Sequence, residues 1–475
     1  MLVGRQGRKR LVLAADAAAQ GLGLHRGLPA AEARALCAEL VVADADPAGD
    51  DEHLDRLALW ALRRYAPVVA SDPPDGLVLD VTGAAHLLGG EDALLADMIE
   101  QLAAVGVTAR AAISGTWGSA HALARFAARP VIAVPSEHSG RAIAGLPVRA
   151  LRLPADMVAA LSKMGIDLVG EIEEKPRAAL ALRFGPELTR RLDQAYGRTA
   201  EPIEPVEAPE LVQVRRAFAE PIGAAETMAR YTLQLVDALC AALEAKGLGA
   251  RTLDLRFHRV DNRIEVIRIG VAKPLRDIRR LTRLLCDKLE TVDPGFGIET
   301  MVLTAPVAEP LTPRPAANAL HEPAEPDVSE LLDTLANRHG ARRLYRVAPA
   351  QSDVPERSVR KLEPTAPETA ETWPLRWPRP TRLLSRPEPI EAVALLPDRP
   401  PVTFTWRGVR RRVRRADGPE RIFGEWWRRD GELDAVRDYF QLEDDAGGRF
   451  WVFRRGDGEQ PATGDLRWFM HGLFA

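Results

Sequence analysis

The fold is decided by one stretch, Pro74-Asp75-Gly76-Leu77-Val78-Leu79-Asp80-Val81-Thr82-Gly83, in which a short apolar run lies between two aspartates. Over residues 1 to about 140, apolar runs of this kind, such as Leu11-Val12-Leu13, alternate with segments of helical periodicity. This alternation is typical of mixed α and β structure. Taken alone, Asp75 and Asp80 need do no more than flank a strand.

Composition predicts an intracellular protein of several domains. The 475 residues exceed one ordinary domain, and the formal net charge is only −3. Of the 64 basic residues 57 are arginines, which suits phosphate contacts but is equally expected of a GC-rich genome. Cys37, Cys240 and Cys286 match no metal or disulfide spacing, as in a reducing compartment. No apolar run approaches the roughly 20 residues of a membrane span, and the chain start lacks the apolar core of a signal peptide.

From about 141 to 205 the periodicity is purely helical. Within this region, residues 161–170 have the form of two short helices joined by a tight glycine hairpin. Free backbone N–H groups in such a hairpin hold a phosphate, although many helical corners look similar. The residues predicted to contact DNA here are Lys163, Gly165, Ile166 and Gly170.

Residues 211–305 repeat one supersecondary pattern twice. Strands are expected at 212–218, 251–260, 263–271 and 298–304, with helices at about 224–246 and 276–291. This β-α-β-β-α-β order is the split βαβ arrangement, and its helices must cover one face of the sheet. The basic residues predicted to reach phosphates from this unit are Arg215, Arg216 and Arg256.

The remainder of the chain changes in character. Residues 305–326 and 349–380 are Pro-rich and predict linkers around a short helix from Ser329 to His339. Seven of the nine tryptophans follow residue 370, among arginine clusters. They indicate either a small β-domain with an aromatic core and solvated arginines, or a surface that docks a partner. The residues predicted to contact that partner are Trp406, Arg421, Trp426, Trp427 and Trp451.

Residues 74–83 resemble the central palm motif of the Y-family DNA polymerases, where a strand carries adjacent Asp and Glu, an apolar pair and then Asp-Val-Thr. Residues 23–37 resemble the fingers segment of that family, and the hairpin at Gly165 and the unit at 211–305 follow in the order of thumb and little finger. The resemblance implies an α+β multidomain fold, a polymerase-like right hand with fingers, palm, helical thumb and split βαβ little finger, plus a small C-terminal domain.

The expected domains divide the chain into six parts. They are a fingers-like segment at 1–45, a palm lacking its first strand at 46–140, a helical thumb at 141–207, a little finger at 208–305, a Pro-rich linker with a short helix at 306–380, and a partner-docking region at 381–475.

The resemblance also implies that catalysis is lost. Nucleotidyl transfer in this family uses two Mg²⁺ ions, which require several carboxylates. Asp75 stands where the motif has its Asp, but Gly76 replaces the Glu. The family's other acid lies on a strand that would precede Met1. One carboxylate of three remains, so we expect no enzyme activity and no cofactor beyond a weakly held Mg²⁺ at Asp75.

The nucleotide pocket is expected to be degraded as well. The family's triphosphate-binding Tyr and Arg fall on Ala17 and Gln20, neither of which offsets the charge of a triphosphate. A palm lysine near the incoming nucleotide falls on or near His121, which is otherwise an ordinary helix residue.

Within the Y family, the palm motif and the ending from Ala416 to Ala475 look most like the ImuB proteins, the polymerase-like members of bacterial ImuA-ImuB-DnaE2 mutagenesis systems. The implied function is a non-catalytic scaffold of translesion synthesis and SOS mutagenesis after DNA damage. Its implied partners are non-sequence-specific primer-template DNA, an ImuA-type protein, a DnaE2-type polymerase and the sliding clamp, in the nucleoid. Residues 305–320 contain no glutamine of a clamp-binding peptide.

Two alternatives remain open at this point. One is an active low-fidelity Y-family polymerase, which would need a full set of acids. The other is a protein-only scaffold that does not bind DNA.

Overall fold

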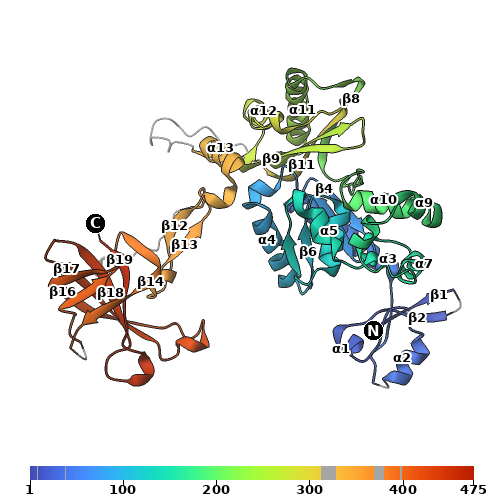
Figure 1. Cartoon of the computed structure of the whole chain (residues 1–475). Helices are drawn as coiled ribbons and strands as arrows, with labels where there is room; N and C mark the ends of the chain where they lie inside the picture. The colour runs from blue at the N-terminus through green and yellow to red at the C-terminus, as the bar shows by residue number, and fades with distance from the viewer. Residues whose placement is uncertain (8, 38, 312–327, 368–378, 396–397, 475) are drawn as a thin grey trace. The chain divides into compact units, whose positions relative to one another are not determined.

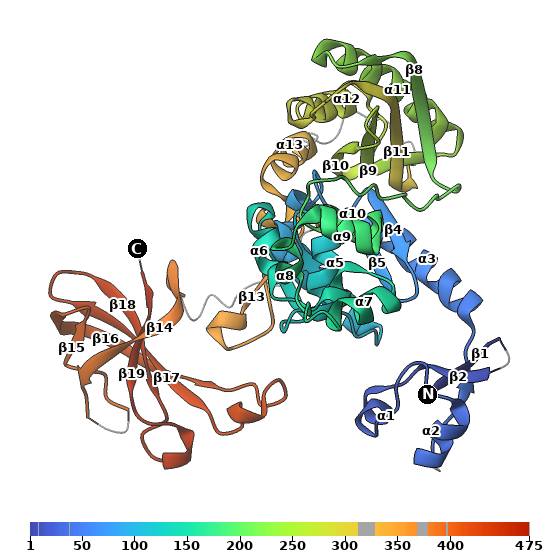
Figure 2. The same ribbon diagram turned by 45° about the vertical axis from the view of Figure 1, so that its right-hand side comes forward.

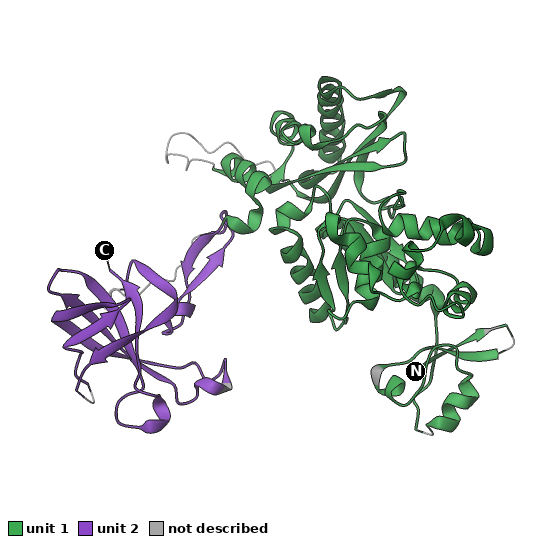
Figure 3. Cartoon of the chain, in the orientation of Figure 1, with its two compact units in different colours: residues 1–344 green, residues 345–475 purple. Residues whose placement is uncertain are grey.

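The computed structural model describes residues 1–474 except 8, 38, 312–327, 368–378 and 396–397, and it divides into two compact units at residues 344 and 345 (Figure 3). Unit 1 contains the expected fingers, palm, thumb and little finger. Unit 2 is a β-structure. Each unit is described by itself below.

The fingers segment is small, and its core is formed by Val12, Leu24, Leu28 and their neighbours. Its sheet has the order β2-β1-β3, with β1 antiparallel to β2 and parallel to β3. The elements of this segment are β1 (Leu2–Gln6), β2 (Lys9–Ala14), α1 (Ala17–Gly21), α2 (Ala30–Leu36) and β3 (Ala43–Asp44).

The palm places the stretch at 74–83 on the hairpin of β4 and β5; Figure 1 labels β4, and Figure 2 labels both strands. Strands β4 and β5 pair antiparallel from Val68 opposite Asp80 to Asp72 opposite Gly76, and Leu77 and Leu79 pack against the core of α3 and α4. A parallel pair, β6 and β7, lies beside α5. The palm elements are α3 (Pro47–Arg64), β4 (Val68–Asp72), β5 (Gly76–Asp80), α4 (Glu91–Ala104), β6 (Ala111–Ile113), α5 (Trp117–Phe126) and β7 (Val131–Ala133).

The thumb is helical, as the periodicity predicts. Its core joins α5 of the palm to short helices through residues such as Leu161, Ile166 and Leu188. The thumb helices are α6 (Ser139–Ala144), α7 (Ala155–Ser162), α8 (Val169–Glu173), α9 (Arg177–Phe184) and α10 (Pro186–Ala195).

The little finger confirms the predicted split βαβ order. Its sheet runs β10-β9-β11-β8, and α11 and α12 cover one face (Figure 2). Leu253, Leu255 and Phe257 of β9 point into the core under the helices, because alternate residues of a strand face opposite sides. The elements are β8 (Val212–Ile222), α11 (Ala225–Ala245), β9 (Leu248–Arg259), β10 (Ile264–Leu275), α12 (Ile278–Cys286) and β11 (Ile298–Pro310).

The region predicted as a linker is more ordered than expected. Helix α13 (Ser329–His339) lies along β10 of the little finger. The Asn337 side chain donates to the carbonyl of Gly270 at 2.7 Å and accepts from its N–H at 3.0 Å, while Asp333 accepts from the N–H of Ala272 at 2.7 Å. The helix therefore belongs to unit 1.

Unit 2 begins before the Pro-rich stretch that was expected to precede it. A hairpin of β12 (Arg346–Pro349) and β13 (Val359–Leu362) is followed by a closed six-stranded barrel, in which strands neighbour one another in chain order. Its strands are β14 (Arg382–Val393), β15 (Thr403–Trp406), β16 (Val409–Phe423), β17 (Val436–Asp444), β18 (Arg449–Arg455) and β19 (Trp468–Leu473).

Candidate functional site

The palm contains a cleft of about 1050 Å³, lined by β5, α4, β6 and the start of α5. Asp75 and Gly76 lie on its wall at the turn that leads into β5. Asp72, from the end of β4, lines the same cleft. The position where the family resemblance places a catalytic centre is therefore a real cavity, and the side chains around it decide what it can hold.

Arg125 occupies the centre of this wall. Its Nη2 lies 2.6 Å from Oδ1 of Asp75, and the guanidinium lowers the pKa of that carboxyl chiefly through this hydrogen bond. A Cβ atom added at Gly76 would lie 3.1 Å from Nη2 of Arg125 and 3.3 Å from Oδ2 of Asp72. The space beside Gly76 is therefore filled by a cation and a neighbouring acid.

Burial shifts the pKa of two further groups of the cleft. His121 on α5 accepts from Nε of Arg125 at 2.9 Å, and burial together with that arginine lowers its pKa to about 4. The imidazole is therefore neutral at pH 7. Burial raises the pKa of Asp72, against the opposing effects of Arg152 and Arg125. Sequence reasoning overlooked Asp72 and Arg125 because both lie outside the motif.

These residues do not fit a pair of divalent cations. The carboxylate of Asp75 already neutralises Arg125, Gly76 has no ligand atom, and Asp80 accepts from the N–H of Thr82 at 2.9 Å. Within the described ranges, no group of three or more His, Cys, Asp or Glu side chains is arranged to hold a metal. A second metal beside Gly76 would meet the guanidinium of Arg125 as well as the carboxylate of Asp72. A single weakly held Mg²⁺ at Asp75 stays a prediction.

The two predicted triphosphate positions lie on α1 of the fingers. Ala17 is the first residue of that helix, and its side chain lies outside the described set. Gln20 is exposed and donates to the carbonyl of Ala15 at 2.8 Å. Its neutral amide supplies no charge for a triphosphate.

The phosphate site predicted at the thumb hairpin requires free backbone N–H groups, but in the structure these groups already have acceptors. The N–H groups of Asp167 and Leu168 donate to the carboxylate of Glu171 at 2.8 and 2.9 Å, and these bonds lower the pKa of Glu171. Those of Gly165 and Ile166 donate to the carbonyls of Ser162 and Leu161.

The hairpin residues that were predicted to contact DNA also differ in their exposure to solvent. Ile166 is buried in the thumb core, and a Cβ added at Gly170 would lie 3.1 Å from the carbonyl oxygen of Ala144. Gly165 is exposed in the left-handed region at φ +71°, and the Lys163 side chain is exposed. Ile166 therefore cannot contact DNA, which leaves Lys163 as the exposed cation of this hairpin.

The little finger brings two of its three predicted arginines together. Arg215 of β8 and Arg256 of β9 both stand opposite Val302 of β11, on the face away from α11 and α12. Arg216 points to the helical face, where its guanidinium lies 5.5 Å from the ring centre of Tyr231. One DNA surface therefore cannot use all three.

The face that carries Arg215 and Arg256 is positively charged. Burial lowers the pKa of Arg256, and its buried Nε has no hydrogen-bond partner among the described residues. His258 on the same face has a lowered pKa through burial and through these two arginines. Farther along the sheet, the buried pair Arg268 and Asp254 joins at 2.6 Å, and Arg268 also donates to the carbonyl of Leu62 in the palm.

Three of the predicted partner contacts in unit 2 serve its own fold. Trp451 is 1% exposed and stacks on Tyr439 at 4.2 Å, so the prediction that it contacts a partner is wrong. Trp406 packs against the barrel core and donates to Glu388 at 2.8 Å. Arg421 makes a bidentate ion pair with the buried carboxylate of Asp438, as described next.

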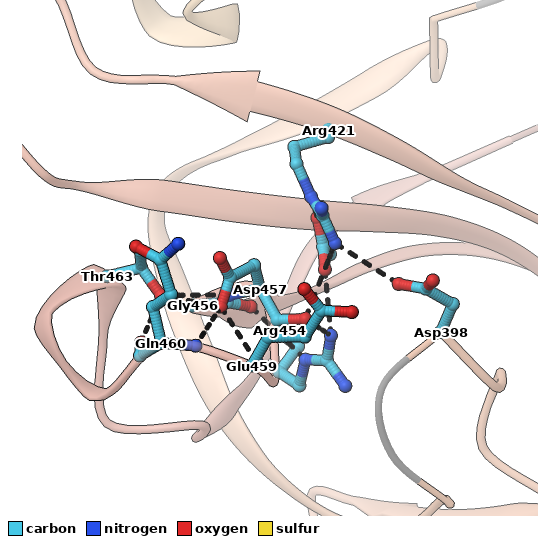
Figure 4. Close-up of polar contacts among 9 residues, drawn as sticks. Asp398, Arg421, Arg454, Gly456, Asp457, Glu459, Gln460 and Thr463 are labelled. Carbon is cyan, nitrogen blue, oxygen red and sulfur yellow. Dashed lines mark hydrogen bonds and ion pairs between the residues drawn. The ribbon is translucent and has the colours of Figure 1, made fainter.

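Figure 4 shows the polar network that holds Arg421. Its guanidinium also reaches Asp398 at 3.1 Å, and Arg454, which is fully buried, donates to Asp438 at 2.7 Å. Asp457 folds the adjoining loop by accepting from the N–H groups of Glu459 and Gln460. Arg421 is therefore committed to the barrel and is not a free anchor.

Trp426 and Trp427 are different. They are 56% and 65% exposed, and their rings meet edge to face at 5.9 Å. The preceding Glu425 is buried and held by Ser352 and by Arg357 at 3.0 Å, which fixes the loop that presents the two rings. Two large apolar side chains thus stand in solvent on a firmly anchored loop.

Comparison with known proteins agrees with this architecture. The impB/mucB/samB family matches residues 1–125, and the C-terminal domain of that family matches residues 210–305. Protein ImuB of Caulobacter vibrioides strain NA1000 is 46% identical over 462 residues, covering 95% of this chain and 100% of that protein. The chain belongs to the ImuB family.

More distant relatives cover a smaller share of the chain. DNA polymerase IV 2 of Mesorhizobium japonicum is 25% identical over 59% of this chain and 69% of its own length. The crystal structure of DinB from Sulfolobus solfataricus is 14% identical, covers 64% of this chain and 90% of that chain, and gives a TM-score of 0.36. The insertion ternary complex of Dbh DNA polymerase gives 0.37.

Membership of the ImuB family confirms the resemblance and the Y-family-like α+β fold class predicted from sequence. It connects the chain to translesion synthesis and induced mutagenesis after DNA damage. Among the residues that the structure describes, no helix is both long and apolar enough to cross a membrane. Residues 312–320, where part of a clamp-binding peptide was sought, lie outside that set.

Proposed function

We propose that this chain is a non-catalytic factor of translesion synthesis that holds primer-template DNA and recruits an error-prone DnaE2-type polymerase and an ImuA-type accessory protein. The observation that carries the proposal is the ion pair of Arg125 with Asp75 beside the side-chain-free Gly76. A Y-family centre needs carboxylates at both positions to offset two dications.

The ion pair opposes metal binding in two ways. The arginine brings a positive charge to the place where a cation would have to lie, and it uses the one carboxylate that the motif retains. His121 is neutral at pH 7, so it adds no charge of either sign to the cleft. A Mg²⁺ ion bound to Asp75 would lie close to the guanidinium of Arg125 and be repelled by it.

DNA binding by unit 1 is supported by the helix-free face of the little-finger sheet, where Arg215 is exposed and Arg256 is partly buried. Arg215 and Arg256 stand on either side of Val302 there, and neither has an ion pair within the described part of the chain. Arginine forks suit phosphate oxygens, and contacts of this kind read no sequence. Lys163 of the thumb is a further exposed cation.

Partner recruitment by unit 2 is supported by Trp426 and Trp427. Tryptophan is among the residues that contribute most to the centres of protein interfaces. An ImuA-type protein and a DnaE2-type polymerase are the partners that the family implies, with the sliding clamp as a further partner for which no site is evident.

Catalysis is tested by primer extension with Mg²⁺ or Mn²⁺, using the purified full chain. We expect no template-dependent extension. The matched control is Asp75→Ala, which separates a contaminating polymerase from the chain's own activity. Extension that Asp75→Ala abolishes would establish an active low-fidelity polymerase instead.

DNA binding is tested by fluorescence anisotropy with labelled primer-template DNA at several salt concentrations. We expect binding without sequence preference that weakens steeply between about 50 and 200 mM salt, because phosphate contacts release counterions. The double variant Arg215→Gln with Arg256→Gln should lower the salt slope, whereas Arg216→Gln on the opposite face should not. Absence of any binding at low salt would favour the protein-only scaffold.

A further inference from the structure

The hairpin of β15 and β16 is the most one-sidedly charged part of unit 2. Residues 401–416 contain six arginines and no Asp or Glu. Two of the six are neutralised within the unit: Arg407 pairs with Glu388 at 2.6 Å, and Arg411 pairs with the buried Asp444 at 2.6 Å.

The other four arginines form no such ion pair with the residues that the structure describes. We call them the outer arginine row: Arg410, Arg412, Arg414 and Arg415. All four are exposed, and none makes an ion pair or side-chain hydrogen bond to any residue that the structure describes. Four neighbouring cations that form no ion pair repel one another, and this repulsion raises the free energy of the isolated unit unless an anion binds there.

The strand register explains why these four share one side of the barrel. Arg411 stands opposite the buried Phe404 and points inward, so its neighbours Arg410 and Arg412 point outward, opposite Thr405 and Thr403. An irregularity in the pairing with β17 falls between positions 413 and 415. A bulge of this kind shifts the alternation by one residue, so Arg415 also faces outward, opposite Glu443.

We propose that the outer arginine row binds the phosphates of a nucleic-acid strand, which makes the barrel a second nucleic-acid contact besides unit 1. Alternate residues of a strand are about 6.6 Å apart. Successive arginines of the row can therefore reach separate phosphates of an extended backbone, each through a planar guanidinium.

A protein partner fits this surface less well. The cores of protein interfaces are apolar and poor in charge, whereas the row's partners in the register on β15 are the threonines Thr403 and Thr405. The exposed apolar pair Trp426 and Trp427 lies beyond the end of β16, on a different segment.

The test compares two quadruple variants of the full chain. In the row variant the four arginines become glutamine. In the control variant four other exposed arginines of the same barrel become glutamine: Arg382, Arg386, Arg455 and Arg467. Both variants lose the same charge. Binding to a labelled oligothymidylate of about 30 nucleotides, longer than the roughly 4–16 that one small β-barrel module covers, is measured by anisotropy over a series of salt concentrations.

We expect the row variant to bind at least about tenfold more weakly and to lower the slope of log affinity against log salt by about 2 to 3, since each lost single-strand phosphate contact removes about 0.7. The control variant should retain most of the affinity and slope. An unchanged thermal unfolding curve shows that the barrel is intact, as expected for exposed side chains.

Four results would overturn the inference. Equal losses in both variants would mean a general charge effect, and unchanged DNA binding by the row variant would remove the row from the interface while leaving the proposed DNA binding by unit 1 standing. Unchanged DNA binding with lost capture of the DnaE2-type polymerase would assign the row to a protein. If the unaltered chain fails to bind the oligonucleotide at all, the proposed function falls together with this inference.

Discussion

Replacing the buried Trp451 of unit 2 should lower its stability, whereas replacing the exposed Trp426 and Trp427 should reduce partner binding and leave stability nearly unchanged. Trp451→Ala removes a ring that is 1% exposed, stacked on Tyr439 and covered by the guanidinium of Arg379 at 5.1 Å. Loss of a buried aromatic side chain costs about 3–5 kcal/mol. The double change of Trp426 and Trp427 to alanine removes rings that are more than half exposed, so we expect a loss of at most about 1 kcal/mol.

The assay is thermal unfolding of residues 345–475, combined with capture of the ImuA-type protein and the DnaE2-type polymerase by the full chain. For a domain of this size we expect Trp451→Ala to lower the Tm by about 10 °C or more, and the double change to lower it by a few degrees at most. Capture should be lost with the double change although the unit remains folded.

Two results would contradict this reasoning. A collapsed unfolding transition for the double change would mean that Trp426 and Trp427 are part of the core. Unchanged capture of both partners with a normal Tm would mean that the exposed pair is not an anchor, and it would remove the support for recruitment through this loop.

Three further outcomes are expected for unit 1. Asp254→Ala leaves the buried Arg268 without its counter-ion and should destabilise the unit by about 3–5 kcal/mol in urea unfolding, whereas replacing both residues by apolar ones should cost much less. Glu171→Gln removes the carboxylate that fills the thumb hairpin and should strengthen DNA binding if the hairpin touches phosphates; an unchanged affinity would exclude that contact. His121 has a folded-state pKa of about 4 against 6.5 ordinarily, so the unfolded chain takes up the proton first and stability falls as the pH drops from about 6.5 to 4. In urea titrations across that range, His121→Gln should flatten this dependence, and an equally steep dependence in the variant would show that other groups cause it.

The two kinds of tryptophan show what the sequence could and could not decide. Trp451 stands in the run Phe450-Trp451-Val452-Phe453, whose members contribute alternately to two core clusters on the two sides of β18. A continuous apolar run of this kind is typical of a strand covered on both faces, so the burial of Trp451 could be predicted from the sequence. Trp426 and Trp427 are flanked by Glu425 and by arginines, which fits a solvent-exposed pair.

The palm shows where sequence reasoning reaches its limit. The structure confirms the predicted strand within residues 74–83, as β5, while the replacement of a catalytic acid by Gly76 stays a prediction. The partner of Asp75 is Arg125, 50 residues away on α5, and that contact depends on how the helix packs against the hairpin. No periodicity within the motif predicts it. The same holds for α13, whose docking on β10 uses Asn337 and Asp333 one helical turn apart.

The docking of α13 has a consequence for self-association. Strand β10 is the outermost strand of the little-finger sheet on one side, and an uncovered edge of this kind is a template for pairing with a second molecule. Asn337 satisfies both backbone groups of Gly270, and Asp333 satisfies the N–H of Ala272. The opposite edge, β8, instead carries exposed charged residues and Pro221, which also discourage pairing. Helix α13 therefore covers the edge of β10 at Gly270 and Ala272. In a chain that ends before residue 329 these backbone groups would be exposed, and we expect such a chain to aggregate more readily.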